Sequence, residues 1–550
     1  MRTFPAAFPR LSGRTVSAAA AVAAAAPMLV LAGRTAVQKP DIPLVADQAL
    51  LQLATINAGQ HAQLLGPYSR FGWHHPGPSW FYLLDTAFLP LGSHSWSFLV
   101  ATLLLNAVVA GGIVLVVARW RGPVAAVAAA VLVLVFLHAL GARQLLSPWN
   151  PYAIVLPTAL LILLAGVAAS GSRLGWIGLG IVASFLVQTH ISTAAAVVAV
   201  VAVAAVLSLL GRLRPRRLPA TTATVEPRPP RRGWVQLGAI VVSSALLVLM
   251  WIPPLIQQAT TSPGNFRELF TFFRSATSDH GFSDAIAGLG RELAIFPFGH
   301  YDEVNPTDSG TPASRWLAIL AVVAACALLI AGARWLGDRL VRAIGVAVLV
   351  AMIAAGWSIT HVNGSLYAYL VAWIAAIPLG LGLGFACLLP AAMARLRAHR
   401  RGRAWTLVPA GIAAAVAATV LATQVDAFVA LRPEDQAPPA GAAVQAAASA
   451  AARSLPAGRI SVEADHDVLA WVAATGISLR LVEDGRDIEV PADWVFEWGD
   501  QFAPRDDRLV GRLLVVTAAR ATAVGAEPGT RPVTSGEGVE VFLRIDPGAG

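Results

Sequence analysis

Apolar residues are grouped along this chain into blocks of roughly 17–25 residues, about the length that an α-helix needs to cross a bilayer. Each block therefore predicts one membrane span. The blocks lie at about 16–32, 96–118, 122–140, 152–169, 174–189, 191–211, 234–256, 316–333, 341–359, 367–392 and 405–423. The pattern predicts a mainly α-helical fold, a polytopic transmembrane bundle of about eleven spans that occupies residues 16–424.

The first block allows two interpretations. It follows Arg2, Arg10 and Arg14, and it ends in the small residues Ala32 and Gly33, as the hydrophobic segment of a cleaved signal peptide does. We favour an uncleaved span, because ten further blocks follow and the count of spans then agrees with the charge pattern.

Arginine-rich connections alternate with arginine-poor ones. The basic connections lie at 119–121, 173, 212–232, 334–342 and 395–403. Because short basic loops stay on the cytoplasmic side of a membrane, this alternation places the N-terminus, residues 1–15, inside and the C-terminus outside. The protein is thus expected to be a multi-pass protein of the plasma membrane.

Composition supports this class and excludes others. Apolar residues make up 56% of the 550 residues and charged residues 13%, whereas soluble domains have about 25% charged residues. The net charge of +9 raises the question of a nucleic-acid partner, but the arginines are concentrated between apolar blocks. They are accounted for as topology signals, so no nucleic-acid partner is expected.

Three segments are predicted on the outer face: loops 34–95 and 257–315, and the tail after residue 424. The tail begins with an Ala/Pro-rich stretch, 425–458, which is typical of a linker. Residues 459–550 then resemble a small α/β domain. We expect strands at 459–463, 478–482, 513–516 and 539–544 and a helix at 468–475. Trp494 and Trp498 are candidates for glycan contacts, or for the core of this domain.

The first outer loop holds the most informative residues. Leu50, Leu53, Ala54 and Asn57 share one helical face, and Asp47 stands at the start of this helix. The pattern predicts a short amphipathic helix on the membrane surface, with the helix dipole keeping the Asp47 carboxylate ionised. The alternative is that Asp47 only caps the helix.

Further along the same loop, Arg70, His74 and His75 form a polar cluster before Pro76 and Pro78. Two adjacent histidines make a weak metal site, since neighbouring side chains point apart. The alternative interpretation is an interfacial cluster of polar and aromatic residues.

Taken together, these motifs resemble the GT-C superfamily of integral-membrane glycosyltransferases, in particular its actinobacterial members. Asp47 near the start of the first outer loop is followed by His75-Pro76 and an apolar, aromatic run to residue 84. Weaker matching segments lie at 147–151, 188–191, 251–254 and 264–266. The resemblance covers about residues 15–424. It departs from the family pattern in one respect, since Gln48 follows Asp47 where members often carry paired acids.

The resemblance implies transfer of a sugar from a polyprenyl-phosphate donor to a cell-envelope glycan, lipid or protein acceptor on the outer face. Asp47 would be the catalytic base of an inverting transfer, and Asp41 would be the second carboxylate, if there is one. Cations would hold the donor phosphate, for which the candidates are Arg70, His74, His75 and Arg267. A divalent metal, Mg²⁺ or Mn²⁺, is a further possible partner of that phosphate.

Other polar residues are weaker candidates. Asp302 and Glu303 could bind a metal or the acceptor, although Asn305-Pro306 just after them favours a solvated turn. His190 lies near the outer end of a span beside two polar residues, and ionisable groups in such places are functional candidates.

Two other classes of function compete with the enzyme. A transporter or flippase of lipid-linked glycans would show an internal repeat and charged residues at mid-span, and the sequence shows neither. A non-catalytic membrane subunit would use Asp47 only as a helix cap.

Overall fold

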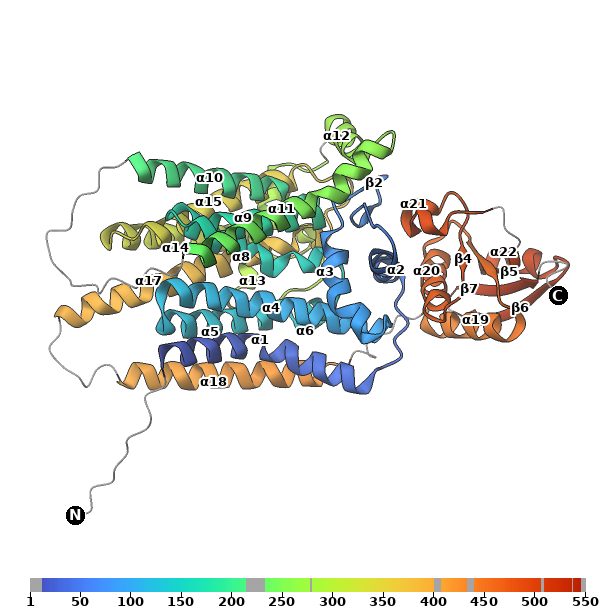
Figure 1. The fold of residues 1–550 in the computed structure, drawn as a ribbon, viewed down its shortest axis with the longest axis horizontal. Helices are drawn as coiled ribbons and strands as arrows, with labels where there is room; N and C mark the ends of the chain where they lie inside the picture. The colour runs from blue at the N-terminus through green and yellow to red at the C-terminus, as the bar shows by residue number, and fades with distance from the viewer. Residues whose placement is uncertain are drawn as a thin grey trace, which may run out of the picture.

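The computed structural model describes residues 12–213, 233–276, 279–399, 407–432, 440–505, 509–536 and 538–545. They form a long helical bundle with a small α/β domain at one end, and the elements between the two parts lie across that end of the bundle (Figure 1). The predicted fold class is therefore confirmed.

The helices of the bundle coincide with the eleven predicted spans. They are α1 (Gly13–Gln38), α4 (Ser95–Arg121), α5 (Pro123–Leu140), α8 (Val155–Ala169), α9 (Arg173–Thr189), α10 (Ala194–Leu213), α11 (Gly233–Thr260), α14 (Pro312–Trp335), α15 (Arg339–Ile359), α17 (Ala376–His399) and α18 (Leu407–Ala430). Within the described residues, nine helical segments are long and apolar enough to cross a membrane, and two shorter apolar segments, 173–189 and 419–430, account for the remaining two.

Helix α1 is an integral part of the bundle. It packs against α4, α5 and α18, and Met28 and Leu31 are completely buried. The small residues Ala20, Ala21 and Ala24 on its inner side are also buried, which allows the close approach of α4.

Two of the arginine-rich turns meet at the same end of the bundle. Arg121 at the end of α4 forms a salt bridge of 2.7 Å with Asp338, which caps the start of α15. These turns lie at the end away from the α/β domain (Figure 1). These two basic turns thus lie at one end of the bundle, as the alternation predicts, whereas residues 214–232 and 400–403 of the other basic connections lie outside the described residues.

Short elements cover the end of the bundle that faces the α/β domain. They are α2 (Ala46–Gln60), β1 (Tyr68–Ser69), β2 (Trp73–His74), α3 (Ser79–Phe88), α6 (Ala142–Leu146), α7 (Asn150–Ala153), α12 (Asn265–Ser275), α13 (Phe282–Ile295) and α16 (Ala368–Val371). The strands β1 and β2 pair antiparallel and present the residues from Tyr68 to His74 as a hairpin.

The segment His75–Pro78 passes close to the turn between α9 and α10. The backbone N–H of Gly77 donates to the carbonyl of Gln188 at 3.3 Å, and a Cβ atom at Gly77 would run into the Gln188 side chain. Ser79 and the carbonyl of Met250 hold that side chain in place. Glycine at 77 is thus required by a close approach between two outer segments.

The C-terminal domain is a five-stranded sheet in the order β4-β3-β5-β7-β6, with helices packed on it. Its strands are β3 (Arg459–Ala464), β4 (Ile488–Glu489), β5 (Leu509–Thr517), β6 (Thr530–Gly536) and β7 (Val539–Ile545), and its helices are α19 (Gly441–Ser454), α20 (Val468–Glu483), α21 (Val495–Trp498) and α22 (Ala518–Gly525). Strand β3 is parallel to β4 and β5, whereas β5 and β7 are antiparallel.

Two details of the tail differ from the sequence prediction. Residues 478–482 are not a strand but the second half of α20, because Ser478, Leu479 and Leu481 are buried on a helical face of that element. The predicted linker contains helix α19, whose Val444 and Ala447 are completely buried and which packs against α20. Its alanine-rich composition therefore forms a packed helix and not an open spacer.

The C-terminal domain is docked on the bundle through α20. The backbone N–H of Ala46 donates to the Thr475 hydroxyl at 2.7 Å, and Gln52 and Ser95 donate to the Glu483 carboxylate at 2.7 and 2.8 Å. Burial raises the pKa of Glu483. These contacts place α2 between the bundle and the domain, so α2 is not free on a membrane surface as its sequence predicted.

Candidate functional site

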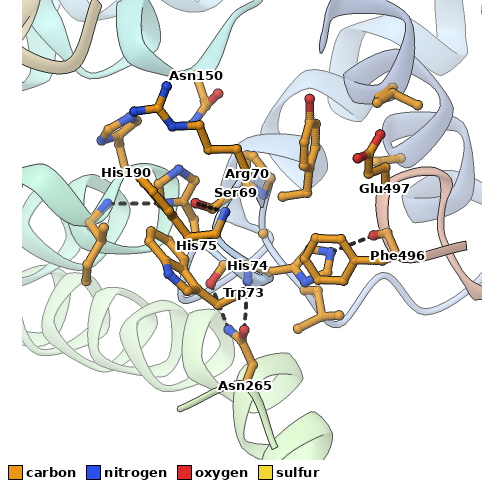
Figure 2. Close-up of a pocket in the computed structure, with 18 of the residues that line it drawn as sticks. Ser69, Arg70, Trp73, His74, His75, Asn150, His190, Asn265, Phe496 and Glu497 are labelled. Carbon is orange, nitrogen blue, oxygen red and sulfur yellow. Dashed lines mark hydrogen bonds between the residues drawn. The ribbon is translucent and has the colours of Figure 1, made fainter. Parts of the chain in front are cut away.

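A cavity of about 1120 Å³ lies at the junction of the bundle and the C-terminal domain. Its walls come from α2, the β1–β2 hairpin, the α9–α10 turn, the start of α12 and the end of α15, and α20 and α21 close it from the domain side. Figure 2 shows Arg70, His190 and Asn150 on one side of this cavity and Phe496 and Glu497 on the other.

Asp47 lines this cavity from the first turn of α2. Its carboxylate accepts a hydrogen bond from the Tyr68 hydroxyl. Burial raises the pKa of Asp47, while hydrogen bonds to Tyr68 and Trp149 act in the opposite direction. A carboxyl group with a raised pKa is a better proton acceptor when it is ionised.

Asp47 lies in the first turn of α2, as predicted, but it is not the residue that caps the helix. The N-cap of α2 is Val45, and the Asp47 side chain makes no capping bond. Burial raises the pKa of Asp47 and thus opposes the ionised state that the helix dipole is expected to favour. The residue before it, Ala46, has a φ of 51°, a left-handed conformation that costs about 1 kcal/mol or more in a non-glycine residue.

His75 and His190 lie against each other at the base of the cavity, with ring centroids 4.4 Å apart. The backbone N–H of Ile191 donates to Nδ1 of His75 at 3.1 Å, so the proton of the neutral ring is on Nε2. Burial holds the pKa of His75 well below its usual value. His75 is therefore a neutral hydrogen-bond donor and not the cation that its sequence position suggested.

His74 connects the hairpin to the C-terminal domain. Its Nε2 lies 3.2 Å from the carbonyl oxygen of Phe496, to which it donates, and the two rings are 4.5 Å apart. Its backbone is held by Asn265, which both accepts from the His74 N–H and donates to its carbonyl. Burial lowers the pKa of His74 to about 4, so this residue too is neutral at physiological pH.

Arg70 is the one arginine or lysine among the described residues that line the cavity. Its guanidinium group lies over the rings of Phe71 and Tyr367, 4.9 Å from each centroid, and donates to the carbonyl of Asn363 at 3.3 Å. Since arginine stays protonated at any physiological pH, Arg70 supplies a fixed positive charge at the exposed rim of the site.

Four other predicted site residues lie outside the cavity. Asp41 forms a salt bridge with Arg480 of α20 at 2.8 Å and helps to dock the domain. Arg267 is exposed on α12, and its neighbours Asn265 and Glu268 line the cavity in its place. The other two belong to a separate cluster: Asp302 pairs with Arg291, and Glu303 accepts from the Tyr152 hydroxyl at 2.9 Å.

Several lining residues were not singled out from the sequence as site residues. Trp149 and Asn150 lie within a segment that matches the family resemblance, and Tyr68 lies two residues before Arg70. Their positions in the sequence could therefore have identified them as site residues. Nothing in the sequence identified Glu497 as a site residue, because it belongs to a different domain from Asp47. Trp498 is 3% exposed and donates to the Ser478 hydroxyl at 3.0 Å, so it belongs chiefly to the core of the domain.

The described part of the chain contains no group of three His, Cys, Asp or Glu side chains arranged to hold a metal ion. The carboxylates of Asp47 and Glu497 both line the cavity, but each is engaged by a neighbouring donor. A requirement for Mg²⁺ or Mn²⁺ stays a prediction, which transfer assays with and without a chelator test.

Comparisons with known proteins place this arrangement among solved folds. No family model matches the sequence, and no curated protein matches it. Among solved structures, ArnT from Cupriavidus metallidurans bound to undecaprenyl phosphate is 13% identical, with a TM-score of 0.53 over 95% of this chain and 98% of that one.

Two further structures overlap the chain at lower scores and do not bear on its fold. One is the apo state of the same ArnT, 11% identical, with a TM-score of 0.41 over 95% of this chain and 97% of that one. The other is arabinofuranosyltransferase AftD from Mycobacteria, 15% identical, with a TM-score of 0.35 over 98% of this chain and 42% of that one. From the ArnT comparison the chain shares the overall fold of that membrane glycosyltransferase structure, which is consistent with the resemblance stated from the sequence.

Proposed function

We propose that this protein is a membrane glycosyltransferase that moves a sugar from a polyprenyl-phosphate donor to a cell-envelope acceptor. The observation that carries the proposal is the position of Asp47 and Arg70 in one large cavity at the end of the bundle. A partly buried carboxylate with a raised pKa and a fixed cation are the two charges that this reaction needs.

The cavity suits a lipid donor. Phe272 and Phe273 of α12 and Trp357 of α15 give it an apolar side next to the bundle, where a polyprenyl chain would lie. Arg70 is the cation that would meet the phosphate, and the neutral Nε2–H group of His75 would add a hydrogen bond. A solved structure that shares this fold, ArnT, was determined with undecaprenyl phosphate, which supports a donor of this class.

The reaction is a single displacement with inversion at the anomeric carbon. Asp47 takes the proton from an acceptor hydroxyl as its oxygen forms a bond to the anomeric carbon, and the bond to the phosphate oxygen breaks at the same time. The electron pair of that bond leaves with the polyprenyl phosphate, whose added negative charge Arg70 stabilises. Phosphate is a good leaving group, so this mechanism does not need a second carboxylic acid.

The arginine-rich turns support a site that faces the outside of the plasma membrane. Arg119 and Arg121 stand in the last turn of α4, and this end of the helix points away from the C-terminal domain (Figure 1). Short basic segments of this kind remain in the cytoplasm. Donor and acceptor would therefore meet on the extracytoplasmic face, together with the C-terminal domain.

Purified protein in lipid nanodiscs, assayed with a panel of polyprenyl-phosphate sugars, tests the proposal. We expect release of polyprenyl phosphate by the wild type and loss of transfer by at least about 1000-fold in Asp47→Asn, since the amide cannot accept the proton. Asp41→Asn is the matched control, because Asp41 lies outside the cavity. Full activity of Asp47→Asn would refute the assignment, and movement of intact donor across the bilayer would show a flippase instead.

A further inference from the structure

The C-terminal domain supplies one wall of the cavity. This wall contains an acidic residue, Glu497, which has no role in the proposed reaction. Glu497 lies in α21, and α21 packs against α2, the helix that carries Asp47. The carboxylates of Asp47 and Glu497 thus line one cavity from two different domains. Burial raises the pKa of Glu497, the hydrogen bond from Trp471 opposes this, and the nearby charge of Asp47 raises it further.

The Glu497 side chain is held in a fixed position. Trp471 of α20 donates from Nε1 to Glu497 Oε2 at 2.5 Å. The preceding residue, Phe496, is held by His74 of the hairpin, as described above. Among the described residues no donor reaches the other oxygen, Oε1, which therefore remains able to accept a hydrogen bond from a bound molecule.

The charge of Glu497 excludes the donor phosphate from its side of the cavity. A carboxylate repels a phosphate group at close range, and the cation that would attract phosphate, Arg70, lies on the opposite side (Figure 2). Besides Glu497, the domain contributes Asp500 and Gln501 to the lining. The carboxylates accept hydrogen bonds, and the amide of Gln501 both accepts and donates them, so these groups are suited to binding hydroxyl groups.

Aromatic side chains complete this wall. Trp471 and Phe496 line the cavity beside Glu497. A few fixed polar groups among aromatic side chains are the usual lining of a small-molecule site, and the flat rings suit the apolar faces of a sugar. The wall therefore has the features of a site for a neutral molecule with several hydroxyl groups.

We propose that Glu497 binds a hydroxyl group of a neutral, polyhydroxylated acceptor, so that the C-terminal domain selects the acceptor while the bundle binds the donor. This inference rests on the proposed function. The hydroxyl that Glu497 holds is a second one on the acceptor, next to the hydroxyl from which Asp47 takes the proton. Glu497 is thus a specificity-determining residue.

Steady-state transfer kinetics on Glu497→Gln and Glu497→Ala in nanodiscs test this inference. The probes are octyl glycosides of hexoses and pentoses, each with deoxy analogues that lack one hydroxyl. The matched control is Asp493→Asn, since Asp493 lies in the same domain, pairs with His466 at 3.1 Å and does not line the cavity. Glutamine keeps the shape of the side chain and an acceptor for Trp471, so it separates loss of charge from loss of folding.

For the best glycoside, we expect both Glu497 variants to raise the apparent KM at least about tenfold, the effect of losing a hydrogen bond to a charged group. The KM for the donor should stay within about twofold, and the variants should no longer discriminate against one deoxy analogue. A purely structural role would change both KM values and the melting temperature together.

Three results would overturn the inference. An unchanged acceptor KM in Glu497→Gln would show that the carboxylate does not bind acceptor. Release of polyprenyl phosphate by the wild type without transfer to any glycoside would show that the acceptor class is wrong, while the proposed function stands. If the wild type releases no polyprenyl phosphate from any donor, the proposed function fails, and this inference fails with it.

Discussion

The hydroxyl of Tyr68 donates a hydrogen bond to the carboxylate of Asp47, 21 positions away along the chain. The bond joins the β1–β2 hairpin to the first turn of α2. It stabilises the ionised form of Asp47 and so opposes the effect of burial on its pKa. Tyr68 is therefore a positioning residue that sets how basic Asp47 is.

Removal of this bond in Tyr68→Phe should raise the pKa of Asp47 further. In the wild type, kcat/KM falls at low pH as Asp47 becomes protonated, and in the variant this fall should begin at a higher pH. We also expect the maximal rate to drop about tenfold, as for the loss of one hydrogen bond to a charged group. The pH profile of transfer between pH 4.5 and 8.5 measures both effects.

Tyr82→Phe is the control for this prediction. The Tyr82 hydroxyl also donates to an outer-loop acceptor, the carbonyl of Gln63, at 3.0 Å, but Tyr82 does not line the cavity. Its pH profile should match that of the wild type. If the acid limb of Tyr68→Phe stays where it is in the wild type, Asp47 is not the group that titrates in catalysis.

His74 should make stability fall in mild acid. Its pKa is about 4 in the folded protein and about 6.5 in an unfolded chain. Between these values the unfolded chain binds a proton that the folded protein does not, so the free energy of unfolding decreases as the pH drops from about 7 towards 4. The variant His74→Gln keeps an N–H donor for the Phe496 carbonyl and has no titrating ring.

The difference in melting temperature between pH 7.5 and pH 5.0, measured in nanodiscs, tests this point. We expect a smaller difference for His74→Gln than for the wild type. His94→Gln serves as control, since His94 lies outside the cavity near the start of α4. Equal differences in all three proteins would show that His74 is protonated without cost in the folded state.

Docking of the C-terminal domain depends on a close approach at Gly476. A Cβ atom there would lie 2.8 Å from side-chain atoms of both Val45 and Val444 and 3.1 Å from the carbonyl of Leu44. Gly476→Ala should therefore move α20 away from the segment before α2, at a cost of about 1–3 kcal/mol. We expect faster hydrogen exchange at residues 44–47 and at least a tenfold loss of transfer.

Gly536→Ala is a matched control in the same domain, because no atom lies within 4 Å of a Cβ built at Gly536. Its exchange rates and activity should be those of the wild type. Normal activity of Gly476→Ala, together with increased exchange at residues 44–47, would show that the reaction does not depend on the docked domain.

Local patterns in the sequence predicted those parts of the molecule that depend on short-range rules. Apolar blocks of membrane-spanning length predicted the positions of the helices. Arginine-rich turns such as that of Arg121 predicted which helix ends lie at the same end of the bundle. The same rules failed at 478–482, because alternating apolar residues in a short segment suit a strand and a buried helix equally. Residues 478–482 are helical because α20 packs against α2 and Ser478 accepts a hydrogen bond from the Trp498 ring.

The site was predicted only where its residues are neighbours in sequence. Asp47, Arg70 and His75 come from one loop and line one cavity, and His190 meets them because its turn packs on His75. The charge states of the histidines were not predictable, since they depend on burial. Glu497 was not predictable either, because no pattern in a single sequence shows how the C-terminal domain docks on the bundle.

The last prediction concerns the donor phosphate. Arg70 alone among the described lining residues is an arginine or lysine, and the two histidines beside it are neutral, so it should contribute most of the charge that attracts phosphate. Arg70→Gln should raise the donor KM between about 10-fold and 100-fold, the effect of losing a charge-assisted bond. Arg70→Lys should recover part of this loss, because it keeps the charge but not the planar fork.

Arg267→Gln provides the control, since Arg267 is exposed on α12 and does not line the cavity. Binding of polyprenyl phosphate to the nanodisc-embedded protein at low and high salt measures the effect directly. Affinity of the wild type should fall with added salt more steeply than that of Arg70→Gln, because the exposed guanidinium is screened. Equal affinities and equal salt dependence in wild type and Arg70→Gln would place the phosphate elsewhere in the cavity, against the backbone and the neutral N–H groups of the His75 region.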